Sequence, residues 1–321
     1  MRVQKTTVAQ GAEHRDDFPM ATPNRPGDAP QFRVGTASWT DPTLVKSDTF
    51  YPPSLKTAEQ RLRFYAEQFD TVEVDSSYYA LPSENNSRLW AERTPDNFIF
   101  NLKAFALLTQ HSADTARLPL AIKEILTPAQ KAELRLKDPP AEVLELSFRM
   151  FAGALEPLRA AGKLGMLLFQ FPPYFVCQPR NLDYISSLKE RLAGDSIAVE
   201  FRHPSWIIEG RRRIETMNFL RQHGLTFVSV DAPAGTIPSF LETTGPEAYV
   251  RFHGRNRENW YRRGIEVSER YKYLYSEREL AGWAGRLKQL SGVKRAFVIF
   301  NNCYRNFGIM NATTMKQMLA H

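Results

Sequence analysis

Eight short apolar runs recur along the chain, and nearly every one of them ends on or beside a polar or charged residue. The runs are rich in β-branched and aromatic residues, which is typical of strands buried on both faces. They occupy residues 33–38, 71–75, 98–103, 165–170, 197–202, 226–231, 249–253 and 297–301. Polar residues at so many strand ends indicate one shared functional rim.

Segments with helical periodicity fill the gaps between these runs. They cover residues 57–68, 83–93, 140–161, 181–192, 212–223, 276–290 and 306–319. Thr57 with Gln60, and Ser276 with Glu279, have the spacing of a capping box, in which the first and fourth residues satisfy each other's backbone N–H groups. The connection at 232–247 is too short and too rich in Gly and Pro for a full helix.

Eight alternations of strand and helix predict an α/β fold, a single-domain (β/α)8 barrel of the TIM type. A doubly wound open sheet is the less favoured alternative, because such a sheet gathers its site at one switch point. Two long connections, 106–140 after the third strand and 254–275 after the seventh, leave from strand carboxyl ends and are expected to form lids or binding loops. The barrel domain is expected over 32–321, after a disordered leader at 1–31.

Bulk composition narrows the class of protein further. The chain has 321 residues, of which 43% are hydrophobic, and no apolar run long enough for a transmembrane helix, so no membrane partner is expected. Two cysteines, Cys177 and Cys303, cannot form a disulfide framework, which makes a cytoplasmic location the expectation. The net charge of +7 includes five arginines within 251–263 and three at 211–213, and such clusters favour anionic partners.

Side chains alternate along a strand, so residues two apart share a face. If the polar pairs point inward, carboxylates and cations meet at the barrel mouth. The candidate catalytic residues are the carboxylates Glu73, Asp75, Glu200 and Asp231. The candidate substrate-binding residues are Lys103, Gln170, Arg202, His203, Arg251, His253, Asn301, Asn302, Trp39 and Tyr78.

Three functional interpretations remain open, beside a purely structural salt-bridge network. The favoured one is a hydrolase or lyase, in which Glu73 and Glu200 act as acid and base while cations hold a phosphate- or carboxylate-bearing small molecule. No cofactor is predicted, but the alternative is a divalent metal bound by Glu73, Glu200, Asp231 and His253. The third is a protein that binds or processes single-stranded nucleic acid through its arginines and loop aromatics. The oligomeric state is left open.

Ordered motifs along the chain also carry a family resemblance. They include Gly35-Thr36-Ala37-Ser38-Trp39, Phe69-Asp70-Thr71-Val72-Glu73-Val74, Ser77-Tyr78-Tyr79, Phe169-Gln170-Phe171-Pro172-Pro173, Glu200-Phe201-Arg202-His203-Pro204, Arg251-Phe252-His253-Gly254 and Phe300-Asn301-Asn302. Residues 33–319 resemble the YecE-like family, a domain of unknown function. The resemblance implies a TIM-type barrel and implies no activity. The stretches 41–48 and 119–137 are longer than the family minimum and suggest a subgroup.

Overall fold

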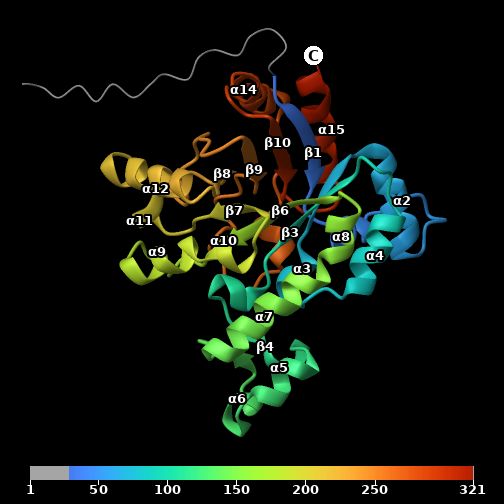
Figure 1. Ribbon diagram of the computed structural model, residues 1–321. Coiled ribbons are helices and arrows are strands. Elements are labelled where there is room, and N and C mark those ends of the chain that lie inside the picture. Colours follow the sequence, from blue (N-terminus) through green and yellow to red (C-terminus); the bar gives the residue numbers. More distant parts are fainter. Residues whose placement is uncertain (1–28, 321) are drawn as a thin grey trace, which may run out of the picture.

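An eight-stranded parallel sheet, rolled into a nearly closed barrel, forms the centre of the computed structural model, which describes residues 29–320 (Figure 1). The strand order around the sheet is β1-β10-β9-β8-β7-β6-β3-β2. The ring closes where β1 meets β2, because Ser38 N–H donates to the Glu73 carbonyl at 2.8 Å. The strands are β1 Gln31–Thr36, β2 Thr71–Val74, β3 Ile99–Lys103, β6 Leu164–Gln170, β7 Ser196–Glu200, β8 Thr226–Asp231, β9 Glu247–Phe252 and β10 Arg295–Phe300. The predicted (β/α)8 barrel is thereby confirmed.

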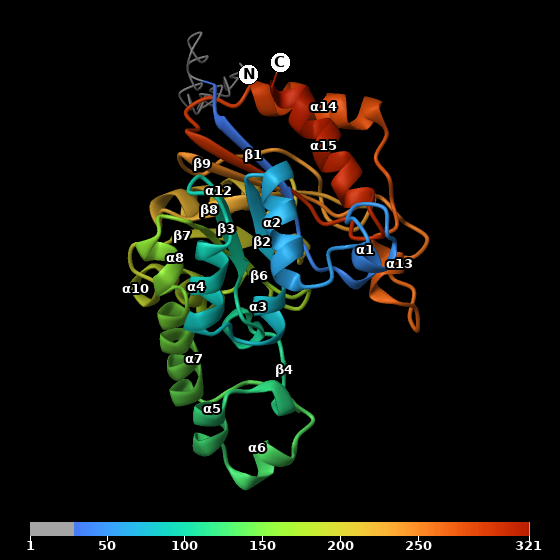
Figure 2. The same ribbon diagram turned by 90° about the vertical axis from the view of Figure 1, so that its right-hand side faces the viewer.

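Helices surround the barrel, and their starts follow the capping signals in the sequence (Figures 1 and 2). Thr57 and Gln60 form the predicted capping box, as do Ser276 and Glu279. The helices on the outside are α1 Pro42–Lys46, α2 Ala58–Gln68, α3 Ser76–Tyr79, α4 Glu84–Glu92, α7 Ala141–Ala154, α8 Glu156–Ala160, α9 Pro179–Ser186, α10 Leu188–Arg191, α11 Pro204–Ile207, α12 Arg211–Gln222, α13 Val267–Arg270, α14 Glu277–Lys288 and α15 Phe307–Ala320. As expected, no helix is found among the described residues 232–246.

The long connection after β3 forms a projection instead of a simple lid. It contains η1 Ala106–Thr109, β4 Ala113–Asp114, η2 Thr115–Arg117, α5 Leu120–Ile125, α6 Pro128–Ala132 and β5 Arg135–Leu136. Strands β4 and β5 pair in antiparallel fashion, and α5 and α6 extend well away from the barrel beyond α7 (Figure 2). Only the root of this connection, near η1, stays close to the strand ends.

Aromatic side chains fill the layer between barrel and helices. Phe175, Phe201 and Trp206 stack in one group, with interplanar angles of 11° between neighbouring rings. Stacked, fully buried rings remove large apolar areas from water and fix the helices on the sheet. Among the described helices, none is both long and apolar enough to cross a membrane.

The leader predicted for residues 1–31 lies, except for its last three residues, outside the described residues. Of those three, Gln31 already belongs to β1 and pairs with Arg295. The ordered barrel therefore begins slightly earlier than the domain boundary expected at residue 32.

Candidate active site at the barrel mouth

One buried arginine joins two buried glutamates across the barrel. Arg251 on β9 donates to Glu73 on β2 through Nε (2.9 Å to Oε2) and Nη2 (2.5 Å to Oε1). Its Nη1 donates to Oε2 of Glu200 on β7 at 2.6 Å. All three side chains are 0% exposed. Arg251 therefore has its nitrogens directed at carboxylates inside the barrel and does not face the solvent as a substrate-binding residue would.

Tyr249 completes this buried network. Its hydroxyl donates to Glu73 Oε2 at 2.8 Å. The sequence analysis did not single out Tyr249, although it lies two residues before Arg251 on the same face of β9, and the alternation rule could have found it.

The two glutamates have pKa values displaced in opposite directions. Burial raises the pKa of Glu73, and Arg251 only partly offsets this effect. Burial acts on Glu200 as well, but Arg202 and Arg251 together hold the pKa of its carboxyl well below the ordinary value. Burial opposes the charge on Arg251, yet the two glutamates raise the pKa of its guanidinium well above the usual range. Glu200 and Arg251 are therefore firmly charged, while Glu73 takes up a proton more easily.

Arg202 and His253 meet beside Glu200. Arg202 forms an ion pair with Oε1 of Glu200, and its Nη2 lies 2.9 Å from Nε2 of His253. The Asn301 amide lies 2.8 Å from the other ring nitrogen, Nδ1, and Gln170 Oε1 lies 3.5 Å from Arg202 Nη2. Burial, reinforced by Arg202, lowers the pKa of His253 to about 3. The imidazole is consequently neutral at ordinary pH and can exchange hydrogen bonds without adding charge.

A second charged group borders the other side of the mouth. Lys103 Nζ lies 3.1 Å from Asp75 Oδ1 and 4.4 Å from the centre of the Tyr78 ring. The same ring contacts His111, at 5.2 Å between ring centres. Removal from water would raise the pKa of Asp75, but Lys103 and Arg251 lower it. Burial, together with Lys103 and Arg202, lowers the pKa of His111 to about 4.

Arg202, Lys103 and Asp75 keep some contact with solvent, unlike the central network of Glu73, Arg251 and Glu200. The side chains of Lys103 and Arg202 are each 11% exposed, and that of Asp75 is 29% exposed. Two further aromatic residues come from the connection after β9. The rings of Trp260 and Tyr271 each lie 6.2 Å from the His253 ring. This connection therefore covers the His253 side of the mouth, as expected for a lid.

Asp231 lies at a strand end, as predicted, but its side chain points toward the surrounding helices and away from the mouth. Its carboxylate accepts two hydrogen bonds from Arg255 (2.8 and 2.6 Å), one from the Tyr275 hydroxyl (2.8 Å) and one from Trp283 Nε1 (2.7 Å). These bonds tie the end of β8 to the segment after β9, through Arg255, to Tyr275 just before α14, and to α14 itself through Trp283. We therefore assign Asp231 to this anchor and no longer to the catalytic set.

The proposed metal ligands also fail to converge. Glu73 is enclosed by Arg251 and Tyr249, and Asp231 belongs to the anchor on α14. Within residues 29–320, no group of three or more His, Cys, Asp or Glu side chains is arranged to hold a metal ion. The donor set Glu73, Glu200, Asp231 and His253 is thus not a metal site in this structure.

Three other predicted contact residues serve the architecture. Asn302 is fully buried and donates to the Tyr273 carbonyl at 2.8 Å. His203 caps α11, because its Nδ1 accepts from Ser205 N–H at 3.1 Å. Trp39 packs in the layer outside the barrel, with its ring 6.4 Å from that of Phe100. These contacts are internal to the protein, and the expectation that Asn302, His203 and Trp39 bind a substrate stays a prediction.

The basic cluster at 211–213 is paired with acidic residues. Arg211 and Arg212 both contact Glu215, and Arg213 lies 3.9 Å from Glu209. A cation that is already paired, at the solvent-exposed start of α12, attracts a further anion only weakly.

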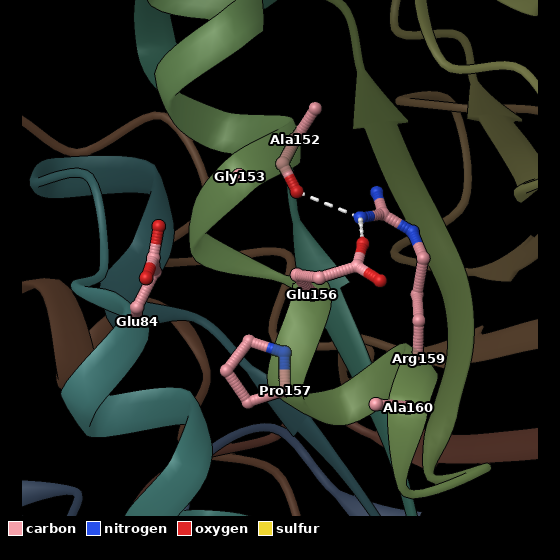
Figure 3. Close-up of a pocket in the computed structure, with 7 residues that line it drawn as sticks. All are labelled: Glu84, Ala152, Gly153, Glu156, Pro157, Arg159 and Ala160. Carbon is pink, nitrogen blue, oxygen red and sulfur yellow. Dashed lines mark hydrogen bonds and ion pairs between the residues drawn. The ribbon is translucent and has the colours of Figure 1, made fainter.

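A separate hollow lies on the outside of the barrel, between α4 and α7–α8 (Figure 3). Its lining includes Glu84, Glu156 and Arg159, and Arg159 Nη1 donates to Ala152 O at 2.7 Å and to Glu156 at 3.1 Å. None of the candidate residues lines it. The hollow is therefore distinct from the barrel mouth.

Together, the closed parallel barrel and the charged residues on its strand ends place the chain among the (β/α)8 barrel proteins with a polar mouth. The family is DUF72, described as a protein of unknown function, whose model matches residues 33–321. The chain belongs to this family, and the YecE-like resemblance seen in the sequence is confirmed.

Individual relatives agree with this assignment. The UPF0759 protein YunF of Bacillus subtilis (strain 168) is 34% identical over 295 residues, which cover 89% of this chain and 93% of YunF. The UPF0759 protein YecE of Escherichia coli (strain K12) is 26% identical over 200 residues, covering 62% of this chain and 58% of YecE. A DUF72 family crystal structure from Thermotoga maritima MSB8 is 34% identical, with a TM-score of 0.70 over 91% of this chain and 100% of that one. A DUF72 family crystal structure from Enterococcus faecalis V583 is 24% identical, with a TM-score of 0.71 over 91% of this chain and 96% of that one. It supports the fold.

Proposed function

We propose that this protein is a hydrolase or lyase that acts at the barrel mouth on a small substrate bearing a phosphate or carboxylate. The observation that carries the proposal is the division of the mouth into two layers. The inner layer, Glu73, Arg251 and Glu200, is wholly buried and internally paired. Lys103 and Arg202 lie above it with part of their surface open to solvent. Cations that are held in place by neighbouring carboxylates and keep part of their surface exposed suit the binding of an anion.

Each residue then has a distinct role. Lys103 and Arg202 hold the anionic group, and the neutral imidazoles of His111 and His253 add hydrogen bonds without adding charge. Glu200 is the general base, since Arg202 and Arg251 keep its pKa low and it contacts both Arg202 and His253. An ionised carboxylate within hydrogen-bond reach of a substrate proton can accept that proton.

Glu73 and Arg251 are positioning residues in this scheme. Arg251 contacts both glutamates. When Glu73 takes up a proton it no longer offsets the charge of Arg251, so the guanidinium attracts the Glu200 carboxylate more strongly. Coupling of this kind lets one site contain two carboxylates of different acidity. Replacing Glu73 by Gln should therefore shift the pH profile of the reaction more than it changes binding of the substrate.

Nucleic acid is a weaker candidate partner. Arg255 in the second basic cluster is held by Asp231 and Glu279, and the cluster at 211–213 pairs with Glu209 and Glu215. Two free cysteines, Cys177 and Cys303, fit the reducing conditions of the cytoplasm, which we propose as the location.

A thermal-shift screen with phosphorylated and carboxylated metabolites tests the proposal. A true ligand at about one hundred times its Kd should stabilise the protein by about 2.7 kcal/mol. Lys103→Met and Arg202→Met should reduce that shift, while Arg211→Met, a matched removal of an exposed cation, should leave it unchanged. If no anionic compound shifts the transition, or if all three variants respond like the wild type, the proposed anion site is wrong.

A further inference from the structure

A cavity of about 580 Å³ lies at the end of β8, on the rim of the barrel mouth. Its lining includes Pro204, Ile208, Ala232, Ala234 and Ile237, with the paired side chains of Asp231 and Arg255 on one side. Its size falls within the range of roughly 300–1,000 Å³ that small-molecule sites occupy. Seven of the eleven lining residues are Gly, Ala, Ile or Pro, and the two charged ones, Asp231 and Arg255, form an ion pair with each other.

The cavity adjoins the anion site through the chain itself. Pro204 follows Arg202 by two residues, and Arg255 follows His253 by two, so each pair of Cα atoms is separated by at most about 7 Å. Arg202 and His253 contact each other at 2.9 Å, across the end of the intervening strand β8. Two of the residues that line the cavity therefore lie within two positions of the residues that close this side of the mouth.

The apolar character of this sector has a structural cause. Asp231, at the end of β8, turns its carboxylate away to Arg255, Tyr275 and Trp283. Beyond it the chain continues as Ala232-Pro233-Ala234-Gly235, which presents small side chains and no charge. The anchor thus pairs the one carboxylate of β8 with Arg255 at one side of the cavity, and the rest of the wall is mostly apolar.

We infer that this cavity is a subsite for the apolar part of the substrate, whose anionic end is held by Lys103 and Arg202. The substrate class is accordingly an organic phosphate or carboxylate with an aliphatic or aryl group, not a bare polar metabolite. The inference rests on the proposed function, because it needs the anion site to orient the molecule. Ile208 supports it, since its side chain is 54% exposed beside the cavity and would be covered by such a group.

The test measures Kd by calorimetry for methyl, butyl and hexyl phosphate, with hexanol as the ligand without an anion. Each methylene buried in the cavity should tighten binding about fourfold. Ala234→Trp, which fills the cavity from an exposed position, and Ile208→Asp should abolish this dependence on chain length while methyl phosphate binds as before. Ile214→Asp, at an exposed isoleucine on α12 outside the cavity, should retain it.

The outcomes separate the inference from the proposed function. Equal Kd values for all three phosphates would overturn the subsite and leave the anion site standing. A chain-length dependence that survives both cavity variants, or hexanol binding as tightly as hexyl phosphate, would also overturn it. Failure of every phosphate to bind would overturn the anion site and the subsite together.

Discussion

Replacing Arg251 by Met should be among the most damaging single changes to this protein. The substitution keeps a long side chain but removes the charge between Glu73 and Glu200. Three charge-assisted hydrogen bonds, at 2.5 to 2.9 Å, disappear from a site without solvent exposure. Removal of one partner from a buried ion pair costs about 3–5 kcal/mol. Because Glu73 loses its ion-pair partner and Glu200 keeps only Arg202, we expect a loss near the upper end, about 5 kcal/mol at pH 7.

The sign of the pH dependence gives a second, independent readout. Without Arg251, the pKa of Glu73 must rise further above its value in the unfolded chain, because burial remains and the compensating charge is gone. At Glu73 the folded variant then binds more protons than the unfolded chain, so its stability relative to the wild type increases as the pH falls from about 7 to 5. The double variant Glu73→Gln/Arg251→Met should be more stable than Arg251→Met alone, because it lacks the buried Glu73 carboxylate that Arg251 no longer neutralises.

Urea unfolding at several pH values measures both effects. Arg211→Met is the matched control, because its side chain is 92% exposed and pairs only with Glu215, so its loss should stay within about 0.5 kcal/mol. The reasoning is refuted if Arg251→Met costs less than about 1 kcal/mol. It is equally refuted if the double variant is the less stable of the two at pH 7.

Other predictions concern the histidines, the anchor and metal content. Since His253 and His111 have pKa values of about 3 and 4 in the folded protein, against about 6.5 unfolded, the unfolded chain binds more protons and wild-type stability should fall as the pH drops from about 6.5 to 4. His111→Asn should reduce the total loss of stability over this pH range by about 3 kcal/mol, measured by urea unfolding at each pH. An unchanged pH dependence would contradict the lowered pKa of His111. Asp231→Ala should lower the free energy of unfolding by about 3 kcal/mol, because it removes one partner of a buried ion pair. The thermal shift given by a phosphate ligand should be preserved. Loss of that shift would show that Asp231 contributes to ligand binding at the mouth. Elemental analysis should find no stoichiometric Mn, Zn or Mg, and a metal lost in His253→Ala would reverse our reading of the donor set.

The sequence predicted the barrel because its signals are local. A buried parallel strand needs a continuous apolar run, and a helix start needs a capping side chain, so both can be recognised in a short window. Alternation then paired Glu73 with Asp75, Glu200 with Arg202, and Arg251 with His253, and the structure places all three pairs around the mouth.

The same alternation could not decide which phase of a strand faces inward when both faces are apolar. On β8 the inward phase excludes Asp231, and of the neighbours Asn301 and Asn302 only the first contacts His253. Loop residues were still less predictable. Trp39 and His203 have the chemistry of ligand contacts, but in the structure the Trp39 ring packs near Phe100 and the His203 ring caps α11.

By itself, then, the sequence determined the number and order of strands, the rim on which polar residues gather, and the balance of carboxylates and cations available there. Only the tertiary structure decided which of those charges neutralise one another. Arg251 became an internal link between Glu73 and Glu200 instead of a substrate contact, because the barrel brings residues about 180 positions apart to hydrogen-bonding distance in a space without water. A charge in that setting must find a partner, and the closed ring of strands determines which partner lies within reach.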